Sequence, residues 1–221
     1  MKKIIFSIIA LSLFFYFQLS AQLTAKVYED PKVEALVRQH KSIAILPLDV
    51  VMTDTKSNKK NRVPQKELDK KAKEYQKAFQ NSMYAWFLKR KQKGKMLPVE
   101  IQDVDRTNTL LKKNNIESTE DLADFTKDEI CTMLEVDAVF GGNVVTSSSF
   151  SKGGATALAI ITGISVKTGD ADVFIKLWDA KEGKMIWSFS RVVASNYANT
   201  TDDVVNYLMK RISKRFPYDN R

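Results

Sequence analysis

The chain has 221 residues, with 35 Lys or Arg against 26 Asp or Glu, a net charge of +9, one Cys and one His. A single cysteine excludes an intramolecular disulfide, and a single histidine excludes a His-rich metal site. This length predicts one domain that is large enough to bury an adequate core. Its stability must therefore come from packing.

Residues 1–21 have the pattern of a cleaved signal peptide. Lys2 and Lys3 form a positive start, residues 4–17 are apolar, and Ala21 is the small residue that precedes the expected cleavage point. The apolar run is shorter than the roughly 20 residues of a spanning helix, so an uncleaved anchor is the weaker alternative. No cysteine lies near the cleavage point. We expect export to the periplasm, or to the periplasmic face of the outer membrane, without lipidation.

The mature chain begins with a predicted helical lead-in at residues 22–41, followed by a first buried strand at 42–51 that Pro47 interrupts. A polar loop leads to a long helix that ends near Gly94. Further expected elements are a strand at 96–102, a short helix at 106–115 and helical pieces at 118–134.

The second half of the chain shows strand signals before a last helix. A third strand is expected at 137–150, where Gly141 and Gly142 indicate a bulge or a close backbone approach. Two alternating runs at 172–194 predict a hairpin, with Gly183 in the left-handed conformation at its turn. An amphipathic helix at 201–216 and a C-terminal tail at 217–221 complete the chain. These elements predict an α/β sandwich of two or three layers, with a mixed sheet, flanking helices and a late β-hairpin.

The long helix lies in a strongly basic segment. Between Lys56 and Lys95 there are fourteen Lys or Arg and three acidic residues. Apolar residues recur there at helical spacing, while lysines follow another face of the same helix: Lys66, Lys70, Lys73 and Lys77. This face is either simply solvated or contacts an anionic surface, which could be acidic lipid headgroups, an acidic glycan or an acidic protein. Nucleic acid is the partner we expect least, because an exported chain rarely meets it.

An apolar insertion at residues 151–168 contains the stretch "GGATALAIITGIS". It is not a phosphate-binding loop, because Lys152 precedes the glycines instead of following them. The segment either packs into the core or contacts a partner or the membrane periphery, with Leu158, Ile160 and Ile161 as candidate contacts. Eighteen residues are barely enough for one membrane-barrel hairpin, and "ALAII" does not alternate. A packed or partner-facing insertion is therefore favoured.

Four features could carry chemistry, and each has a structural interpretation. Cys131 lies in a helical apolar pattern and is expected to be buried. His40 is expected to be structural or exposed on the surface, and Asp105 with Arg106 to form a structural ion pair or cap. Cross-strand packing is the simplest explanation of Trp178 and Trp187. We therefore expect no catalytic residue, no cofactor, no metal and no enzymatic activity.

Four blocks carry a resemblance that extends over residues 42–216: "IAILPLDV", "VDRTNTLLKKNNI", "VDAVFGGNVV" and "FIKLWDAKEGKMIWS". Their order resembles that of the curli-secretion-channel (CsgG-like) superfamily, which includes lipoprotein activators of penicillin-binding proteins and the N-terminal domain of TolB. The resemblance implies one domain with a mixed sheet flanked by helices, which binds partners or assembles into rings, and no catalytic residue. The chain departs from many relatives in lacking an acylated cysteine, and from the channel formers in lacking long barrel strands.

Two functional hypotheses follow. The first is a non-enzymatic envelope protein of the CsgG-like type that binds a protein or another envelope partner. The alternative is a ring-forming component for assembly or secretion at the outer membrane, a homo-oligomer that exposes its insertion to lipid.

Overall fold

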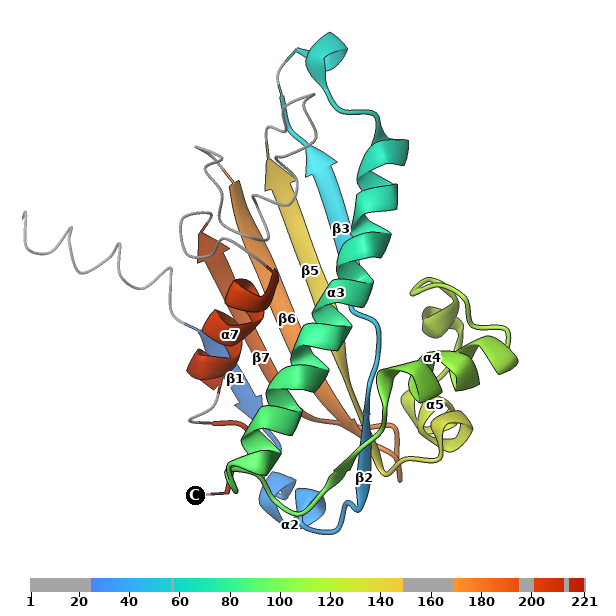
Figure 1. Cartoon of the computed structure of the whole chain (residues 1–221), viewed down its shortest axis with the longest axis vertical. Coiled ribbons are helices and arrows are strands. Elements are labelled where there is room, and N and C mark those ends of the chain that lie inside the picture. Colours follow the sequence, from blue (N-terminus) through green and yellow to red (C-terminus); the bar gives the residue numbers. More distant parts are fainter. Residues whose placement is uncertain (1–24, 57, 149–168, 195–200, 213–214, 221) are drawn as a thin grey trace, which may run out of the picture.

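The chain folds into a seven-stranded mixed sheet with flanking helices (Figure 1). The computed structural model describes residues 25–56, 58–148, 169–194, 201–212 and 215–220, so the predicted signal peptide and the apolar insertion lie outside the described residues. The strands are β1 (Lys26–Glu29), β2 (Ser42–Ile45), β3 (Asp49–Asp54), β4 (Glu100–Ile101), β5 (Ala138–Ser148), β6 (Gly169–Asp179) and β7 (Met185–Ala194). The helices are α2 (Val33–Val37), α3 (Gln65–Gln92), α4 (Val104–Lys113), α5 (Lys127–Leu134) and α7 (Thr201–Ile212), with short 3-10 turns η2 (Lys59–Asn61) and η3 (Asp121–Asp124).

The long strand β5 organises the sheet. The strand order is β1-β7-β6-β5-β2-β4, and β3 also pairs with β5. On one side β2 and β3 pair in parallel with successive stretches of β5, and on the other side β6, β7 and β1 continue the sheet in antiparallel pairing. The single strand predicted at 42–51 is therefore two strands, and Pro47, which cannot donate to a ladder, lies in the break between them.

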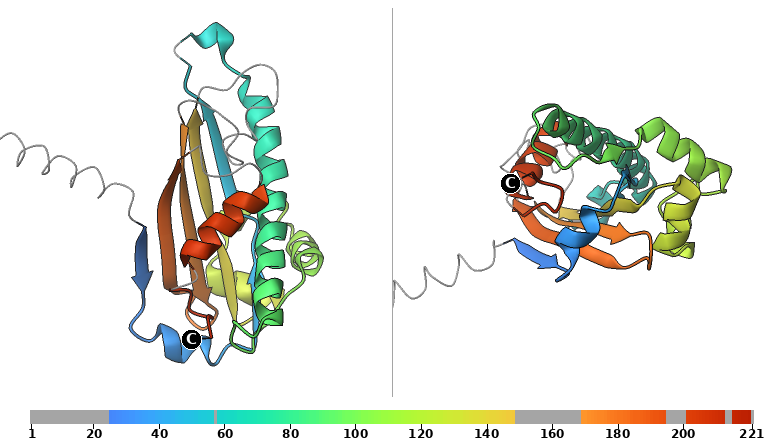
Figure 2. Two further views of the ribbon diagram at one scale, coloured as in Figure 1. Left: turned by 60° about the vertical axis from the view of Figure 1, so that its left-hand side comes forward. Right: turned by 90° about the horizontal axis from the view of Figure 1, so that it is seen from below.

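The helices cover the two faces of the sheet unequally (Figure 2). Helices α3 and α7 pack on one face and build the larger core cluster with it. Helices α4 and α5 pack on the opposite face around β2 and the start of β5, where Ala44, Leu46 and Val139 meet Ile130 and Leu134. The predicted α/β fold is confirmed, with three layers at this end of the sheet and two layers of described elements at the other.

An aromatic cluster lies at the centre of the larger core. Phe140 of β5 packs edge-on against Phe87 of α3, with ring centroids 5.3 Å apart, and against Phe216 at 5.7 Å. Trp187 of β7 stacks on Phe140 at 6.3 Å and is fully buried. Trp178 lies on the other face of the sheet, against the α4 and α5 layer. The expected cross-strand pairing of the two tryptophans is therefore wrong. Trp187 lies opposite Leu177, the residue before Trp178, and successive residues of a strand point to opposite faces of the sheet.

The sheet face opposite α3 exposes apolar side chains where α4 and α5 do not reach. Three of the four exposed large hydrophobic residues of the described chain lie on it: Tyr28 on β1, Val51 on β3 and Phe174 on β6. Tyr28 and Phe174 have polar neighbours in register, Ser188 for Tyr28 and Asn143 and Ser190 for Phe174, whereas Val51 lies beside Val145. This face is therefore mixed in character and not a continuous apolar surface.

Both ends of the domain differ from the sequence-based prediction. Residues 22–41 were expected to be a helical lead-in, but they contain the strand β1, which pairs antiparallel with β7, before the short helix α2. Residues 217–221 were expected to be a tail, but Tyr218 is fully buried, and its carbonyl accepts a hydrogen bond from the Leu97 N–H. Each segment is held by contacts with residues far away in the chain, which local patterns cannot show.

The glycines of the strand and of the hairpin meet their predicted requirements. A Cβ at Gly142 would lie 1.9 Å from the Phe174 carbonyl oxygen, so β5 approaches β6 there more closely than any side chain permits. Gly183 has φ +60, as the hairpin turn requires, and a Cβ there would meet Asp128 at 2.6 Å. The backbone approach at Gly142, and not a bulge, explains the paired glycines, because pairing with β6 continues without a shift through Gly141 and Gly142.

Replacing Gly142→Ala should destabilise the domain by about 2–3 kcal/mol, because the new methyl group forces β5 and β6 apart. The control is Gly94→Ala, at φ +64 with no heavy atom within 4 Å of the new Cβ, which should lose only about 1 kcal/mol through backbone strain. Urea unfolding of both variants measures the difference. Equal losses would contradict the close approach as the reason for glycine at position 142.

Candidate functional site

Helix α3 presents a stripe of lysines on the side away from the sheet. Its apolar stripe is buried as predicted from Leu68 to Met83, with Leu68 and Phe79 each at 1% exposure, but at its end Phe87 is buried and Trp86 only partly so. The four predicted lysines are all exposed: Lys66, Lys70, Lys73 and Lys77. In the part of the chain that the structure describes, none of these four lysines forms an ion pair. We call these four residues the lysine face.

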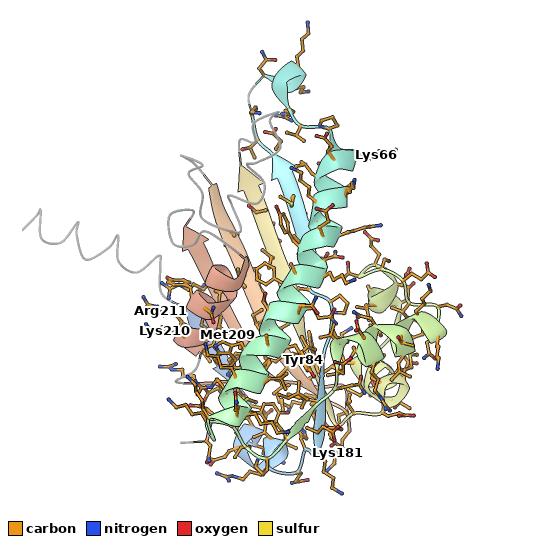
Figure 3. All side chains as sticks on the ribbon, viewed as in Figure 1. Lys66, Tyr84, Lys181, Met209, Lys210 and Arg211 are labelled. Atoms are coloured by element: carbon orange, nitrogen blue, oxygen red, sulfur yellow. The ribbon has the colours of Figure 1, made fainter. Side chains whose placement is uncertain are left out.

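The lysine face concentrates positive charge along one line. Its last member lies eleven positions after its first, a distance of about 17 Å at the rise of an α-helix. Figure 3 places Lys66 near the N-terminal end of α3, well away from α4. An anion that follows the helix can therefore meet several ammonium groups in sequence. Their attraction would be screened over about 8 Å at physiological ionic strength.

A cavity of about 360 Å³ opens beside the second half of the lysine face, between α3 and the segment that runs from α4 to η3. We call it the α3–α4 pocket. Lys73 and Lys77 line it from α3, and Lys112 lines it from the last turn of α4. Lys66 and Lys70 are not among the lining residues. The structure thus brings half of the predicted lysines together with a cation from another helix.

The base of the pocket contains a reciprocal pair of side-chain amides. Gln80 Nε2 donates to Asn108 Oδ1 at 3.1 Å, and Asn108 Nδ2 donates back to Gln80 Oε1 at 3.0 Å. Gln80 Nε2 also donates to the Ile45 carbonyl of β2 at 2.7 Å. With an exposure of 1%, Gln80 is one of the few buried polar residues described. These bonds join α3, α4 and the sheet at one point, and so they fix the spacing of the pocket walls.

The remaining lining of the pocket is part apolar and part polar. Pro47, Leu111, Ile116 and Leu122 contribute to it, together with Gln76, Ser118 and Thr119. One acidic residue, Glu117, lies among the lining residues against the three lysines. Sequence patterns missed Lys112, Gln80 and Asn108, because the α3 and α4 sides of this site are far apart in sequence, with 28 positions between Gln80 and Asn108. The one local signal in the sequence was a glutamine, Gln80, next to Phe79 of the apolar stripe.

Asp105 and Arg106 do not form the expected pair or cap. The cap of α4 is Asp103, whose Oδ1 accepts hydrogen bonds from the backbone N–H groups of Asp105 and Arg106. Arg106 pairs with Glu135 across to the end of α5, at 2.7 Å. The ion pair and the cap at this position therefore have other partners than predicted. The cap falls to Asp103 because that residue immediately precedes the first helical turn.

His40 belongs to a buried polar network. Its Nδ1 lies 2.5 Å from the Tyr218 hydroxyl, and its Nε2 lies 2.8 Å from Asp179 Oδ1. An imidazole protonated on Nε2 satisfies both contacts, because it donates to the carboxylate and accepts from the phenol. Burial raises the pKa of Tyr218 well above its usual value of 10.0. The network ties the end of the chain to the hairpin and to the start of β2.

Cys131 is buried in the α5 layer, as predicted. Burial raises the pKa of its thiol to about 12, which leaves almost no thiolate near neutral pH. The described residues hold no group of three potential metal-ligating side chains close enough to share an ion. They also include no helix long and apolar enough to cross a membrane. The candidate contacts Leu158, Ile160 and Ile161 lie outside the described residues.

No family profile and no curated protein sequence matches the chain. Among solved structures, it is similar to the lipoprotein GNA1162 of Neisseria meningitidis, with a TM-score of 0.40 and 13% identity over 80% of this chain and 99% of that one. A PelC dodecamer of Paraburkholderia phytofirmans gives a TM-score of 0.40 and 14% identity over 89% and 99%. The LpoB C-terminal domain of Salmonella enterica gives 0.33 and 10% over 74% and 93%. These similarities are too low to assign the chain to a family.

Replacing Tyr218→Phe should lower the free energy of unfolding at neutral pH by about 1–3 kcal/mol, because it removes the partner of His40 Nδ1. A raised folded-state pKa means that Tyr218 contributes stability below pH 10, which is lost as the pH rises above that value. The variant should therefore lose less stability than the wild type above pH 10. Urea unfolding at neutral and alkaline pH measures both effects.

The control is Tyr28→Phe, which removes an exposed phenol on β1 and should leave stability at neutral pH unchanged. Parallel losses of stability above pH 10 in the wild type and in Tyr218→Phe would count against this account of the network.

Proposed function

We propose that the protein is a non-enzymatic binding protein of the cell envelope, which holds an anionic partner on its lysine face. The observation that carries this proposal is the exposure of Lys66, Lys70, Lys73 and Lys77 along one helix, with no ion pair to any described residue. Structural lysines commonly pair with nearby carboxylates or cover apolar surface. A line of unpaired ammonium groups is instead available to an external anion.

The physical role of such a face is to attract and orient. Long-range attraction increases the rate of encounter, and matched charges fix the register of the partner along α3. The packing of α3 against the sheet supports this role, because it holds the helix, and with it the spacing of the four lysines, in place. The affinity of an exposed charge pair is modest, about 0.2–1 kcal/mol, so several pairs must act together.

The absence of catalysis in this proposal is supported by the positions of the two most reactive side chains. Cys131 is buried with a raised pKa, and both ring nitrogens of His40 are engaged inside the core. Neither is placed to reach a substrate at the α3–α4 pocket. The placement in the envelope rests on the signal-peptide pattern of residues 1–21.

Reversing all four charges with Lys→Glu at positions 66, 70, 73 and 77 should abolish the association of the mature protein with the envelope fraction. Thermal stability should change by less than about 1 kcal/mol, because the four side chains are exposed. Sedimentation of cell envelopes washed at low and high salt, followed by immunoblotting, measures the association. High salt should release the wild-type protein, because salt screens the exposed charges.

The matched control reverses four other exposed lysines that lie off this stripe: Lys89, Lys91, Lys93 and Lys95. This control has the same net charge as the test variant and should remain associated. Release by detergent alone, with no effect of salt, would refute the proposal and favour the ring-forming alternative with a lipid-inserted segment.

A further inference from the structure

We infer that the α3–α4 pocket binds an acidic peptide segment in which an apolar side chain is flanked by carboxylates. This inference rests on the proposed function, because it assigns the chemistry of the partner at one end of the lysine face. We infer a peptide because the pocket offers both lysines and apolar residues, and a purely anionic surface would contact only the lysines.

Three lysines on two helices give the pocket its positive charge. Lys73, Lys77 and Lys112 line the pocket against the single carboxylate of Glu117. Within the described parts of the chain, none of these three lysines forms an ion pair. The rim therefore has an excess of two positive charges, directed at one small volume from both sides. Two carboxylates of a ligand would complete it.

Four apolar residues also line the pocket. Leu111, Ile116 and Leu122 are almost fully buried, at 3%, 4% and 7% exposure, and yet they border the cavity. Pro47 adds a further apolar surface. The cavity of about 360 Å³ is near the lower end of the usual range for ligand sites, about 300–1,000 Å³. This volume suits one large aliphatic or aromatic side chain with its neighbouring backbone.

The base of the pocket is built to keep its shape. A buried glutamine is unfavourable unless its polar atoms are paired, and Gln80 achieves this with Asn108 and the Ile45 carbonyl. Asn108 uses one of its two amide hydrogens on Gln80, which leaves a second donor on a residue that lines the pocket. A peptide carbonyl would satisfy it. A bilayer surface, in contrast, would meet the lysines and leave the apolar recess unused.

The test uses two capped heptapeptides, Gly-Asp-Glu-Leu-Glu-Asp-Gly and the same peptide with Gly in place of Leu. Each is titrated into the mature chain and followed by backbone amide NMR, which detects weak binding. The Leu peptide should bind about tenfold more tightly than the Gly peptide, because burial of a leucine side chain is worth at least one factor of ten. The shifted amides should cluster around the α3–α4 pocket.

Two pairs of variants separate the pocket from the general charge of α3. K73E/K77E and K66E/K70E change the net charge equally on the same helix, but only the first pair alters the pocket. K73E/K77E should weaken the Leu peptide at least about tenfold, and K66E/K70E less than about threefold. Gln76→Trp fills the pocket without changing charge, and it should remove the preference for the Leu peptide while the Gly peptide binds as before. Thermal melting confirms that each variant is folded.

Each other outcome has a definite meaning. Three outcomes would overturn the inference that the pocket binds an acidic peptide: equal affinity for the two peptides, equal losses of affinity in the two charge variants, or no peptide binding. If the envelope association still responded to salt and to the four-lysine variant, the proposed function would survive that result. Tighter binding to phosphatidylglycerol vesicles than to the Leu peptide would overturn the inference in favour of a lipid surface. Peptide binding with a salt-insensitive envelope association would instead refute the proposed function alone.

Discussion

The docking of α3 on the sheet, through the aromatic cluster around Phe140, is the constraint on which the other features depend. Phe87 and Phe216 close over Phe140, and each fully buried aromatic side chain contributes about 1.5–3 kcal/mol of burial free energy. Because these contacts fix the rotation of α3 about its axis, the opposite stripe of the helix must face solvent. The exposure of the lysine face is thus a consequence of core packing, and charge repulsion among the lysines is tolerated because water screens it.

The relation between α3 and α4 depends on polar contacts as well as apolar ones. The amide pair of Gln80 and Asn108 joins the two helices and also satisfies the Ile45 carbonyl of β2. The polar pair keeps an open recess beside Lys73 and Lys77, which converts a line of charges into a site with shape. Shape and charge together can select a partner, whereas charge alone attracts many anions.

The most reactive side chains of the chain contribute to stability. His40 contacts Asp179 and Tyr218, which lie 139 and 178 positions further along the chain. Cys131 fills the core of the α5 layer. A protein that cannot form an intramolecular disulfide must hold its ends by such contacts, and the buried Tyr218 does this at the C-terminus. The proposed binding at α3 and the stability contributed by this network therefore depend on separate sets of residues.

The amino-acid sequence by itself determined the features that depend on local periodicity and backbone geometry. These are the helix of α3 with its apolar and lysine stripes, the hairpin turn at Gly183 and the mixed α/β class, whereas at Gly141 and Gly142 a bulge and a close backbone approach both remained open. Only the tertiary structure decided the strand β1, the burial of Tyr218 and the assembly of Lys112, Gln80 and Asn108 beside Lys73. The physical reason is that a stripe repeats every few residues, whereas a pocket forms where distant segments meet, and no local pattern records that meeting.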